Sequence, residues 1–279
     1  MQDSLDRLAP LVFVLAFAAL WVAESASAAR PPTRDNARRR RNLAITALNF
    51  LLGGASAAVL LAASVWVAHF SWGLTALPTL PSWLAVLAGV LLIDLTDYVR
   101  HRLSHHLPLL WRLHRVHHTD AWMDVTTSLR SHPLEQLLRP LFSVAAILLF
   151  GIAPMALALS SLVQLPILLF QHANIRLPAA LERALGWLIP TPALHRVHHS
   201  RQRSETDTNY ATALTAWDRA LGTFHGPGTT STAGLDGFDD PRHQSIVGML
   251  SSPWRAPVAG DLAHRADTPS PLARADANV

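Results

Sequence analysis

The feature that most limits what this chain can fold into is a series of long stretches that contain no charged residue. Half of the 279 residues are hydrophobic and only 15% are charged. The mean hydropathy of +0.23 is high for a soluble domain. Because the apolar residues are gathered into runs instead of being spread at core periodicity, we predict an all-α, multi-pass helical membrane protein.

Three such runs lie in the first hundred residues. Residues 8–23, extended by the small residues of ESASAA, have about the length that a helix needs to cross the hydrocarbon. A secretory signal peptide is the alternative, but the leading MQDSLDR carries two Asp and one Arg, whereas a signal peptide starts with positive charge. Residues 43–66 are the second expected span, and a third begins at Trp83 and ends among Asp94, Asp97 and Arg100.

Residues 141–171 form a fourth uncharged stretch, interrupted by Gly151 and Pro154. We expect a hairpin of two helices that enters and leaves on one side, either spanning the membrane or re-entrant. Both forms return His172 to the side on which the third span ends. Residues 177–188 carry leucines at helical spacing and fit an amphipathic helix at the interface or a short core helix.

The basic residues indicate the orientation. Arg38 to Arg41 are consecutive and follow the first expected span, which places them on the cytoplasmic side by the positive-inside rule. The third span then returns to the cytoplasm. Although the net charge is +4, the basic residues are not organised as a groove-reading module, so we expect no nucleic-acid partner.

Composition excludes several chemistries. The absence of Cys rules out disulfides, thiolate metal sites, Fe–S clusters and cysteine nucleophiles. All 23 basic residues are Arg, so the chain has neither a Schiff-base lysine nor a P-loop. No G-x-G-x-x-G is present, and nothing suggests a nicotinamide or flavin domain in the chain. Any metal must be bound by His, Asp or Glu.

Histidines are concentrated around the end of the third span. His101 and His105 form H-x3-H, and two H-x2-H-H boxes follow, at His114, His117 and His118 and at His195, His198 and His199. Residues three and four apart share one helix face, so each group directs several imidazoles to one point. Eight imidazoles exceed the four ligands of a structural zinc site and suit two metal ions. His106 points away from the His101 face.

These motifs resemble the membrane fatty acid hydroxylase and sterol desaturase superfamily, across roughly residues 90–225. That family has H-x3-4-H, H-x2-H-H, a lone His after a hydrophobic hairpin, and a second H-x2-H-H. The blocks that carry the resemblance are D-x3-Y-x2-H-R-x2-H at 94–105, L-W-x2-H-x2-H-H at 110–118, R-S-H-P-L-E at 130–135, Q-H-A-N at 171–174, T-P-x2-H-R-V-H-H-S at 191–200 and N-Y-x5-A-W-D-R-x2-G-T at 209–223.

The resemblance implies a cytosolic helical cap with a His-ligated centre of two iron ions, O2 as co-substrate, and electrons from a separate donor of the ferredoxin, cytochrome or reductase type. The implied metal ligands are His101, His105, His114, His117, His118, His172, His195, His198 and His199. His132 is either a ligand or a residue that supports one. Apart from the resemblance, Asp94, Asp97, Asp124 and Asp218 are candidates either to orient the ligands by accepting their distal N–H groups or to serve as ordinary helix caps and arginine partners.

The sequence therefore predicts a lipid-oxidising enzyme in three regions. Residues 1–82 form an N-terminal transmembrane region, residues 83–225 the hydroxylase-like domain, and residues 226–279 a polar and partly disordered tail. Hydroxylation and desaturation share this ligand framework, and we favour hydroxylation of a sterol, fatty acyl chain or related hydrocarbon. The alternative from another class is a membrane metal-binding or metal-transport protein, and imidazole suits Fe, Zn and Cu alike.

Overall fold

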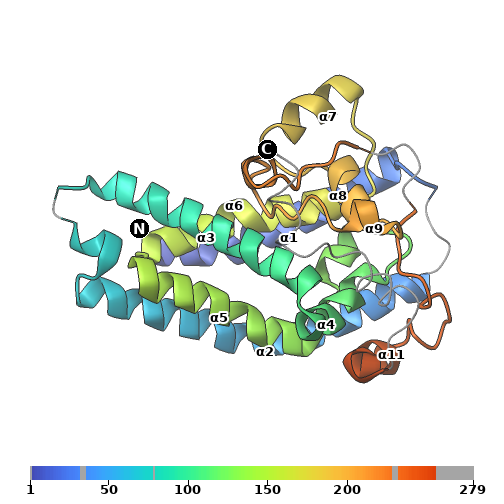
Figure 1. Ribbon diagram of the computed structural model, residues 1–279, viewed down its shortest axis with the longest axis horizontal. Helices are drawn as coiled ribbons and strands as arrows, with labels where there is room; N and C mark the ends of the chain where they lie inside the picture. Colours follow the sequence, from blue (N-terminus) through green and yellow to red (C-terminus); the bar gives the residue numbers. More distant parts are fainter. Residues whose placement is uncertain (1, 32–35, 78, 228–231, 256–279) are drawn as a thin grey trace, which may run out of the picture.

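The protein is built from helices, as the sequence predicts (Figure 1). The computed structural model describes residues 2–31, 36–77, 79–227 and 232–255. Within these residues there is no β-strand, and the extended segments form two isolated bridges, Ala28 with Ile175 and Ser200 with Ala233.

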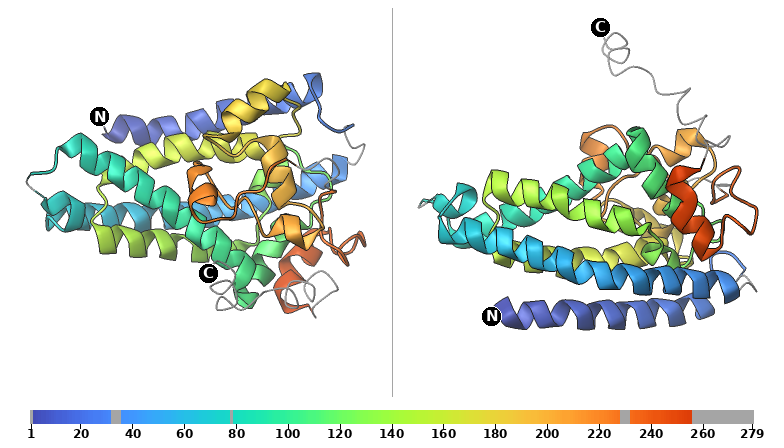
Figure 2. Two further views of the ribbon diagram at one scale, coloured as in Figure 1. Left: turned by 45° about the horizontal axis from the view of Figure 1, so that its top comes forward. Right: turned by 90° about the horizontal axis from the view of Figure 1, so that it is seen from below.

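Five long helices run side by side along the longest axis (Figures 1 and 2). They are α1 (Gln2–Ala26), α2 (Asn36–His69), α3 (Ser82–His106), α5 (Pro133–Phe150) and α6 (Pro154–His172). Short helices connect them or gather at one end of the bundle. These are η1 (Gly73–Ala76), α4 (Pro108–His118), η2 (Val125–Leu129), α7 (Ala179–Gly186), α8 (Pro192–His198), α9 (Arg203–Thr206), α10 (Ala216–Ala220), α11 (Ile246–Ser251) and η3 (Ser252–Trp254).

The long helices turn apolar side chains outward. Each of the five contains a segment long and apolar enough to cross a membrane, and at most 28% of such a segment is buried inside the bundle. Val14, Leu51 and Leu149, for example, are more than half exposed. Apolar surface of this extent is stable when lipid covers it. The prediction of a multi-pass integral membrane protein is confirmed.

The hairpin expected within residues 141–171 is present as α5 and α6, although α5 begins earlier, at Pro133. Gly151 ends α5 with φ of +68°, a left-handed conformation that favours glycine. A Cβ on Gly151 would lie 1.9 Å from the carbonyl oxygen of Trp72, and the Trp72 indole donates to the Leu148 carbonyl at 2.8 Å. This turn therefore packs tightly against the loop after α2.

A small apolar core holds this end of the bundle together. Val67, Ile93, Ile147 and Ile152 pack against one another between α2, α3, α5 and α6. Ser64 donates to the Ile152 carbonyl at 2.8 Å within the same contact. The core leaves the opposite ends of α3 and α6, which carry histidines, to be organised by polar contacts.

The arginine run does more than indicate orientation. Helix α2 begins at Asn36, so the arginines form its first turns. Arg38 is buried and forms ion pairs with Asp120, at 2.6 Å, and with Asp124. Burial raises the pKa of Asp120, but Arg38 and Arg130 outweigh it and hold that pKa well below its usual value. These contacts fix the start of α2 to the loop that follows α4.

Helix α7 lies on the surface. Leu181, Trp187 and Leu188 in and after this helix are exposed, which favours the interfacial alternative over a core helix. The Arg219 guanidinium lies 3.8 Å from the centre of the Trp187 ring and joins α7 to α10.

The part of the C-terminal region that the structure describes is packed onto the domain. Leu235 and Phe238 contact Trp111 of α4, and Met249 of α11 packs with Ile45 and Val116. Residues 256–279, which belong to the tail expected to be partly disordered, lie outside the described residues.

Candidate metal centre

The histidines predicted as ligands come together at one end of the bundle. They form two adjacent buried groups, and within each group the candidate ligand atoms lie within 4.8 Å of one another. The first group consists of His101, His105, His114, His118 and His198. The second group consists of His117, His172, His195 and His199. We call them cluster A and cluster B.

Each H-x2-H-H box is divided between the clusters. His114 and His118 are four residues apart on α4 and share a helix face, so both enter cluster A while His117 enters cluster B. In the second box the assignment is reversed, because His195 and His199 enter cluster B and His198 enters cluster A. Each of the two adjacent clusters therefore takes histidines from both boxes. The expectation that each group directs its imidazoles to one point differs from the structure, which shares the histidines of each box between two clusters.

Main-chain carbonyls fix which ring nitrogen carries the proton. A carbonyl oxygen only accepts hydrogen bonds, so an Nδ1 atom that contacts one must be the donor. Four rings make this contact and direct a bare Nε2 lone pair inward. The bonds are His101 to Tyr210 at 2.8 Å, His117 to Arg130 at 3.1 Å, His172 to Leu168 at 2.7 Å and His198 to Thr208 at 2.8 Å.

The bare nitrogens face one another. Nε2 of His117 lies 3.0 Å from Nε2 of His172. Both rings carry their proton on Nδ1, so neither Nε2 atom can donate a hydrogen bond to the other. Nε2 of His101 lies 3.2 Å from that of His114. Two acceptors at this distance repel each other unless a cation lies between them. Two nitrogens bound at about 2.1 Å to one metal at right angles would be about 3.0 Å apart, so the donor set fits metal ions.

Other ring nitrogens have no partner among the described residues. Nε2 of His198 and both ring nitrogens of His199 are buried without a hydrogen bond. A buried polar atom left in this state costs free energy, and metal coordination would satisfy it.

Burial also keeps the rings neutral. Desolvation, followed by repulsion from neighbouring histidines, lowers the pKa values of His117, His118, His195 and His199 well below 6.5. Desolvation lowers the pKa of His198 to about 3. Neutral imidazole is the form that binds metals, so the site is prepared to accept cations.

Two carboxylates contact the histidines directly, and neither was predicted from the sequence. Glu135 of α5 accepts from Nδ1 of His114 at 2.8 Å, and Asp207 contacts Nδ1 of His105 at 3.3 Å. Glu135 stands in the R-S-H-P-L-E block, so its motif was recognised without its role. Nothing in the sequence around Asp207 indicates that the chain after α9 folds back onto α3.

The predicted supporting aspartates lie elsewhere. Asp94 accepts from the Ala213 and Leu214 amides and the Trp217 indole, and it holds the 213–217 segment against α3. Asp97 pairs with Arg100 at 3.3 Å. Neither carboxylate contacts a histidine in the part of the chain that the structure describes.

Asp218 acts through the main chain. It accepts from the Tyr210 and Ala211 amides at 2.8 and 3.0 Å, and the Tyr210 carbonyl accepts a hydrogen bond from Nδ1 of His101. Asp124 caps η2 and pairs with Arg38 and Arg39.

His132 and His106 lie outside both clusters. Nδ1 of His132 accepts from the Leu134 amide at the start of α5, and its Nε2 donates to the Leu250 carbonyl at 3.0 Å. Both ring nitrogens are thus engaged in joining α5 to α11. His106 is exposed, as expected from its position on α3.

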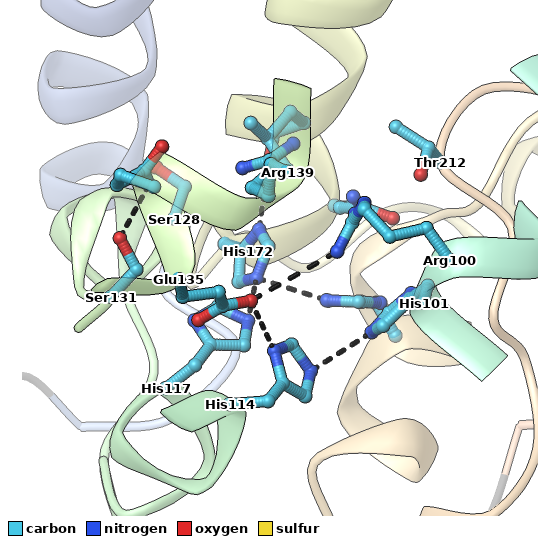
Figure 3. Close-up of a pocket in the computed structure, with 14 residues that line it drawn as sticks. Arg100, His101, His114, His117, Ser128, Ser131, Glu135, Arg139, His172 and Thr212 are labelled. Carbon is cyan, nitrogen blue, oxygen red and sulfur yellow. Dashed lines mark hydrogen bonds and ion pairs between the residues drawn. The ribbon is translucent and has the colours of Figure 1, made fainter. Parts of the chain in front are cut away.

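A pocket opens beside the clusters (Figure 3). His101, His114 and His172 form part of its wall, and Arg100, Glu135 and Arg139 face them in the same pocket. Ser128, Ser131 and Thr212 add hydroxyl groups. A small molecule can therefore reach both groups of histidines.

Comparison with known proteins agrees with this geometry. Residues 86–223 match the fatty acid hydroxylase family, and this range contains every histidine of clusters A and B. This part of the chain belongs to the fatty acid hydroxylase family. The resemblance drawn from the motifs is confirmed.

The names of several curated relatives describe lipid hydroxylases or monooxygenases. The chain is 31% identical over 175 residues to an ornithine lipid hydroxylase of Rhizobium tropici, covering 62% of this chain and 51% of that protein. It is 34% identical over 142 residues to an alkylglycerol monooxygenase of Danio rerio, covering 51% and 30% of the two chains.

A cholesterol 25-hydroxylase-like protein of Danio rerio is 31% identical over 140 residues, which are 50% of this chain and 54% of that protein. The matches span about half or less of these relatives' own lengths. No solved structure matches the chain.

Proposed function

We propose that this protein is a membrane-bound, O2-dependent lipid hydroxylase that holds two iron ions in clusters A and B and receives electrons from a separate donor. The observation that carries the proposal is the set of opposed Nε2 lone pairs, such as His117 and His172 at 3.0 Å. Family membership and the names of the relatives support the lipid as substrate.

The reaction must insert one oxygen atom into a C–H bond. Written in full, a substrate R–H, O2, two electrons and two protons give R–OH and water. Iron would supply the redox chemistry for this step, which no side chain provides. The chain has no cofactor-binding motif for hydride delivery, so the two electrons come from a protein or reductase outside it.

The protein's own residues hold and orient the centre. Glu135 fixes the tautomer of His114, and the Tyr210 carbonyl does the same for His101. Burial of the rings restricts the access of water to the pocket that adjoins the two clusters. Because the pocket adjoins the transmembrane helices, a lipid can approach from the bilayer while a donor docks from the aqueous side.

The histidine end is proposed to face the cytoplasm. The arginine run at the start of α2 lies at this end, since Arg38 pairs with Asp120, two residues after His118. The positive-inside rule then assigns this side to the cytoplasm. Placement at one end of the spans, instead of the midplane, also argues against a metal transporter.

The test is to purify the protein from membranes, measure its iron content, and assay conversion of candidate lipids under ¹⁸O2 with a reconstituted reductase. We expect two iron ions per chain and a product that carries ¹⁸O. A desaturated product without ¹⁸O would identify a desaturase. Protein that holds iron but reacts with no lipid under any donor tested would contradict the proposal.

A matched pair of variants controls for nonspecific iron. His172→Ala removes a cluster B ligand candidate, whereas His106→Ala removes an exposed histidine outside both clusters. The first should abolish turnover and the second should retain it.

A further inference from the structure

Arg139 is an unusual residue for its position. It lies in α5, within a segment apolar enough to cross the membrane, and it makes no hydrogen bond or ion pair with any residue the structure describes. An ionisable residue at membrane depth is costly and generally has a function that involves a partner. Its charge acts on Glu135 in the same pocket, but its guanidinium donors have no hydrogen-bond acceptor among the described residues.

The neighbouring charges are already paired. Arg100 contacts Asp97 at 3.3 Å and Glu135 at 3.9 Å, and Glu135 also binds His114 at 2.8 Å. Two carboxylates thus face two guanidinium groups, those of Arg100 and Arg139, and Arg139 is close enough for its charge to act on Glu135. Arg139 is the member of this group whose guanidinium makes no hydrogen bond or ion pair with a described residue, so its N–H donors can take an acceptor from a ligand.

Arg139 also lines two neighbouring cavities. Gln136 and Arg139 line both the pocket beside the histidines and a cleft of about 280 Å³ between α2, α3, α5 and α6. The cleft wall contains aliphatic side chains, including Leu60, Ile93 and Leu157. It also contains hydroxyl groups, among them that of Ser160, which is buried without a hydrogen-bond partner among the described residues, and the Asp97 carboxylate, which pairs with Arg100.

A cleft with both kinds of wall fits an amphiphile. Its hydrocarbon would contact the aliphatic side chains, and its polar end would meet Gln136 and Arg139. A guanidinium binds carboxylate and phosphate groups through paired hydrogen bonds. Figure 3 shows Arg139 in the same pocket as His101, His114 and His172, so a group bound there would lie beside the proposed metal centre.

We propose that Arg139 binds the acidic group, a carboxylate or a phosphate, of an amphiphilic substrate whose chain occupies this cleft. The inference rests on the proposed function, because it names the substrate class of that site. It selects acidic lipids over neutral lipids of the same chain length.

Binding, not turnover, tests the inference. Metal-loaded protein is incubated in detergent with chain-matched hexadecanoic acid, hexadecyl phosphate or hexadecanol, and the bound probe is quantified after gel filtration in high salt. Wild-type protein should retain one acidic probe roughly tenfold better than the alcohol. The two acidic probes distinguish a carboxylate from a phosphate headgroup.

Three variants make the result specific. Arg139→Gln should remove the preference, Arg139→Lys should keep part of it, and Arg183→Gln, on the exposed face of α7, should leave it unchanged. High salt suppresses nonspecific attraction of acidic lipids to a basic protein. An acid that binds the metal directly would keep its preference in Arg139→Gln and overturn the inference.

The outcomes separate this inference from the proposed function. Loss of preference in Arg139→Gln supports the subsite even if no oxygenated product is ever found. No preference in wild-type protein overturns the subsite even if a neutral lipid is hydroxylated. If Arg139→Gln does not fold, the comparison of wild-type protein with Arg139→Lys decides. Suppose Arg139→Lys retains the alcohol as the wild type does and prefers the acidic probe as strongly as the wild type. Such a result would argue against a paired guanidinium contact.

Discussion

His117 and His172 direct their Nε2 atoms at each other across 3.0 Å, while each Nδ1 donates to a main-chain carbonyl. The Arg130 and Leu168 carbonyls thereby impose the same tautomer on rings that are 55 positions apart in the chain. These two opposed Nε2 atoms form the centre of cluster B.

Removing one of these rings should remove one metal ion. In His172→Ala, cluster B keeps three of its four imidazoles, whereas cluster A keeps all five of its own. We expect the metal content to fall from about two ions per chain to about one. Elemental analysis of purified protein measures this, with His106→Ala as the control that retains both ions. Equal metal content in the two variants would contradict a site at cluster B.

Glu135 should control metal affinity through His114. Glu135→Gln keeps the size of the side chain but replaces a charged acceptor by a neutral amide, so the His114 tautomer is no longer fixed. Loss of such a supporting contact typically costs 10- to 100-fold in metal affinity or activity, and we expect about that range. Metal competition with a chelator measures it.

Asp97→Asn is the matched comparison for Glu135→Gln. Asp97 contacts Arg100 and no histidine, so its variant should bind metal like the wild type. A larger loss of metal in Asp97→Asn than in Glu135→Gln would restore the role that sequence spacing suggested for Asp97.

The Arg38 ion pairs should contribute to stability. Arg38→Met leaves Asp120 buried without its main cation, and breaking a buried pair from one side costs about 3 to 5 kcal/mol. Thermal unfolding in detergent should show a clear decrease in Tm. Arg40 is exposed on the same turns of α2, and Arg40→Met should unfold close to the wild-type temperature.

Metal-free protein should lose stability in mild acid. The folded protein holds the pKa of His198 at about 3, and those of His117, His118, His195 and His199 are well below 6.5. The unfolded chain takes up these protons near pH 6.5, but the folded chain does not. Stability is therefore complete above about pH 6.5 and decreases as the pH falls toward about 3.

Calorimetry of chelator-treated protein checks this pH dependence. The metal-loaded protein should release its ions over the same window, because the ligands must be deprotonated. A Tm of metal-free protein that is constant from about pH 7.5 to about pH 5 would show that these rings are not kept neutral in the folded state.

The orientation of the protein in the membrane can be determined by labelling single introduced cysteines, because the chain contains no cysteine of its own. His106 is exposed at the histidine end of the bundle and Leu77 is exposed at the other end, after η1. In intact cells, a membrane-impermeant thiol reagent should label Leu77→Cys and spare His106→Cys. Labelling of His106→Cys from outside would reverse the proposed topology.

The sequence by itself determined the helical membrane fold, and its motifs, through the resemblance that they carry, indicated the histidines that gather. Uncharged runs of sufficient length limit a chain to membrane-crossing helices, and the interruption at Gly151 and Pro154 is enough to predict the α5–α6 hairpin. The H-x2-H-H spacing is local, because residues three and four apart meet on one helix face whatever surrounds them. His106 was separated from the other histidines by the same reasoning.

Only the tertiary structure decided how the histidines are shared and what holds them. His117 lies in the cluster that holds the other two histidines of the second box, and His198 lies in the cluster that holds the other two of the first. This sharing arises because α4 and α8 approach each other, and spacing within a helix carries no information about that approach. Glu135 and Asp207 reach their histidines across different elements, while Asp94 and Asp97, which are close to His101 in sequence, turn to other partners. Contacts between distant segments depend on packing, so local pattern could not identify them.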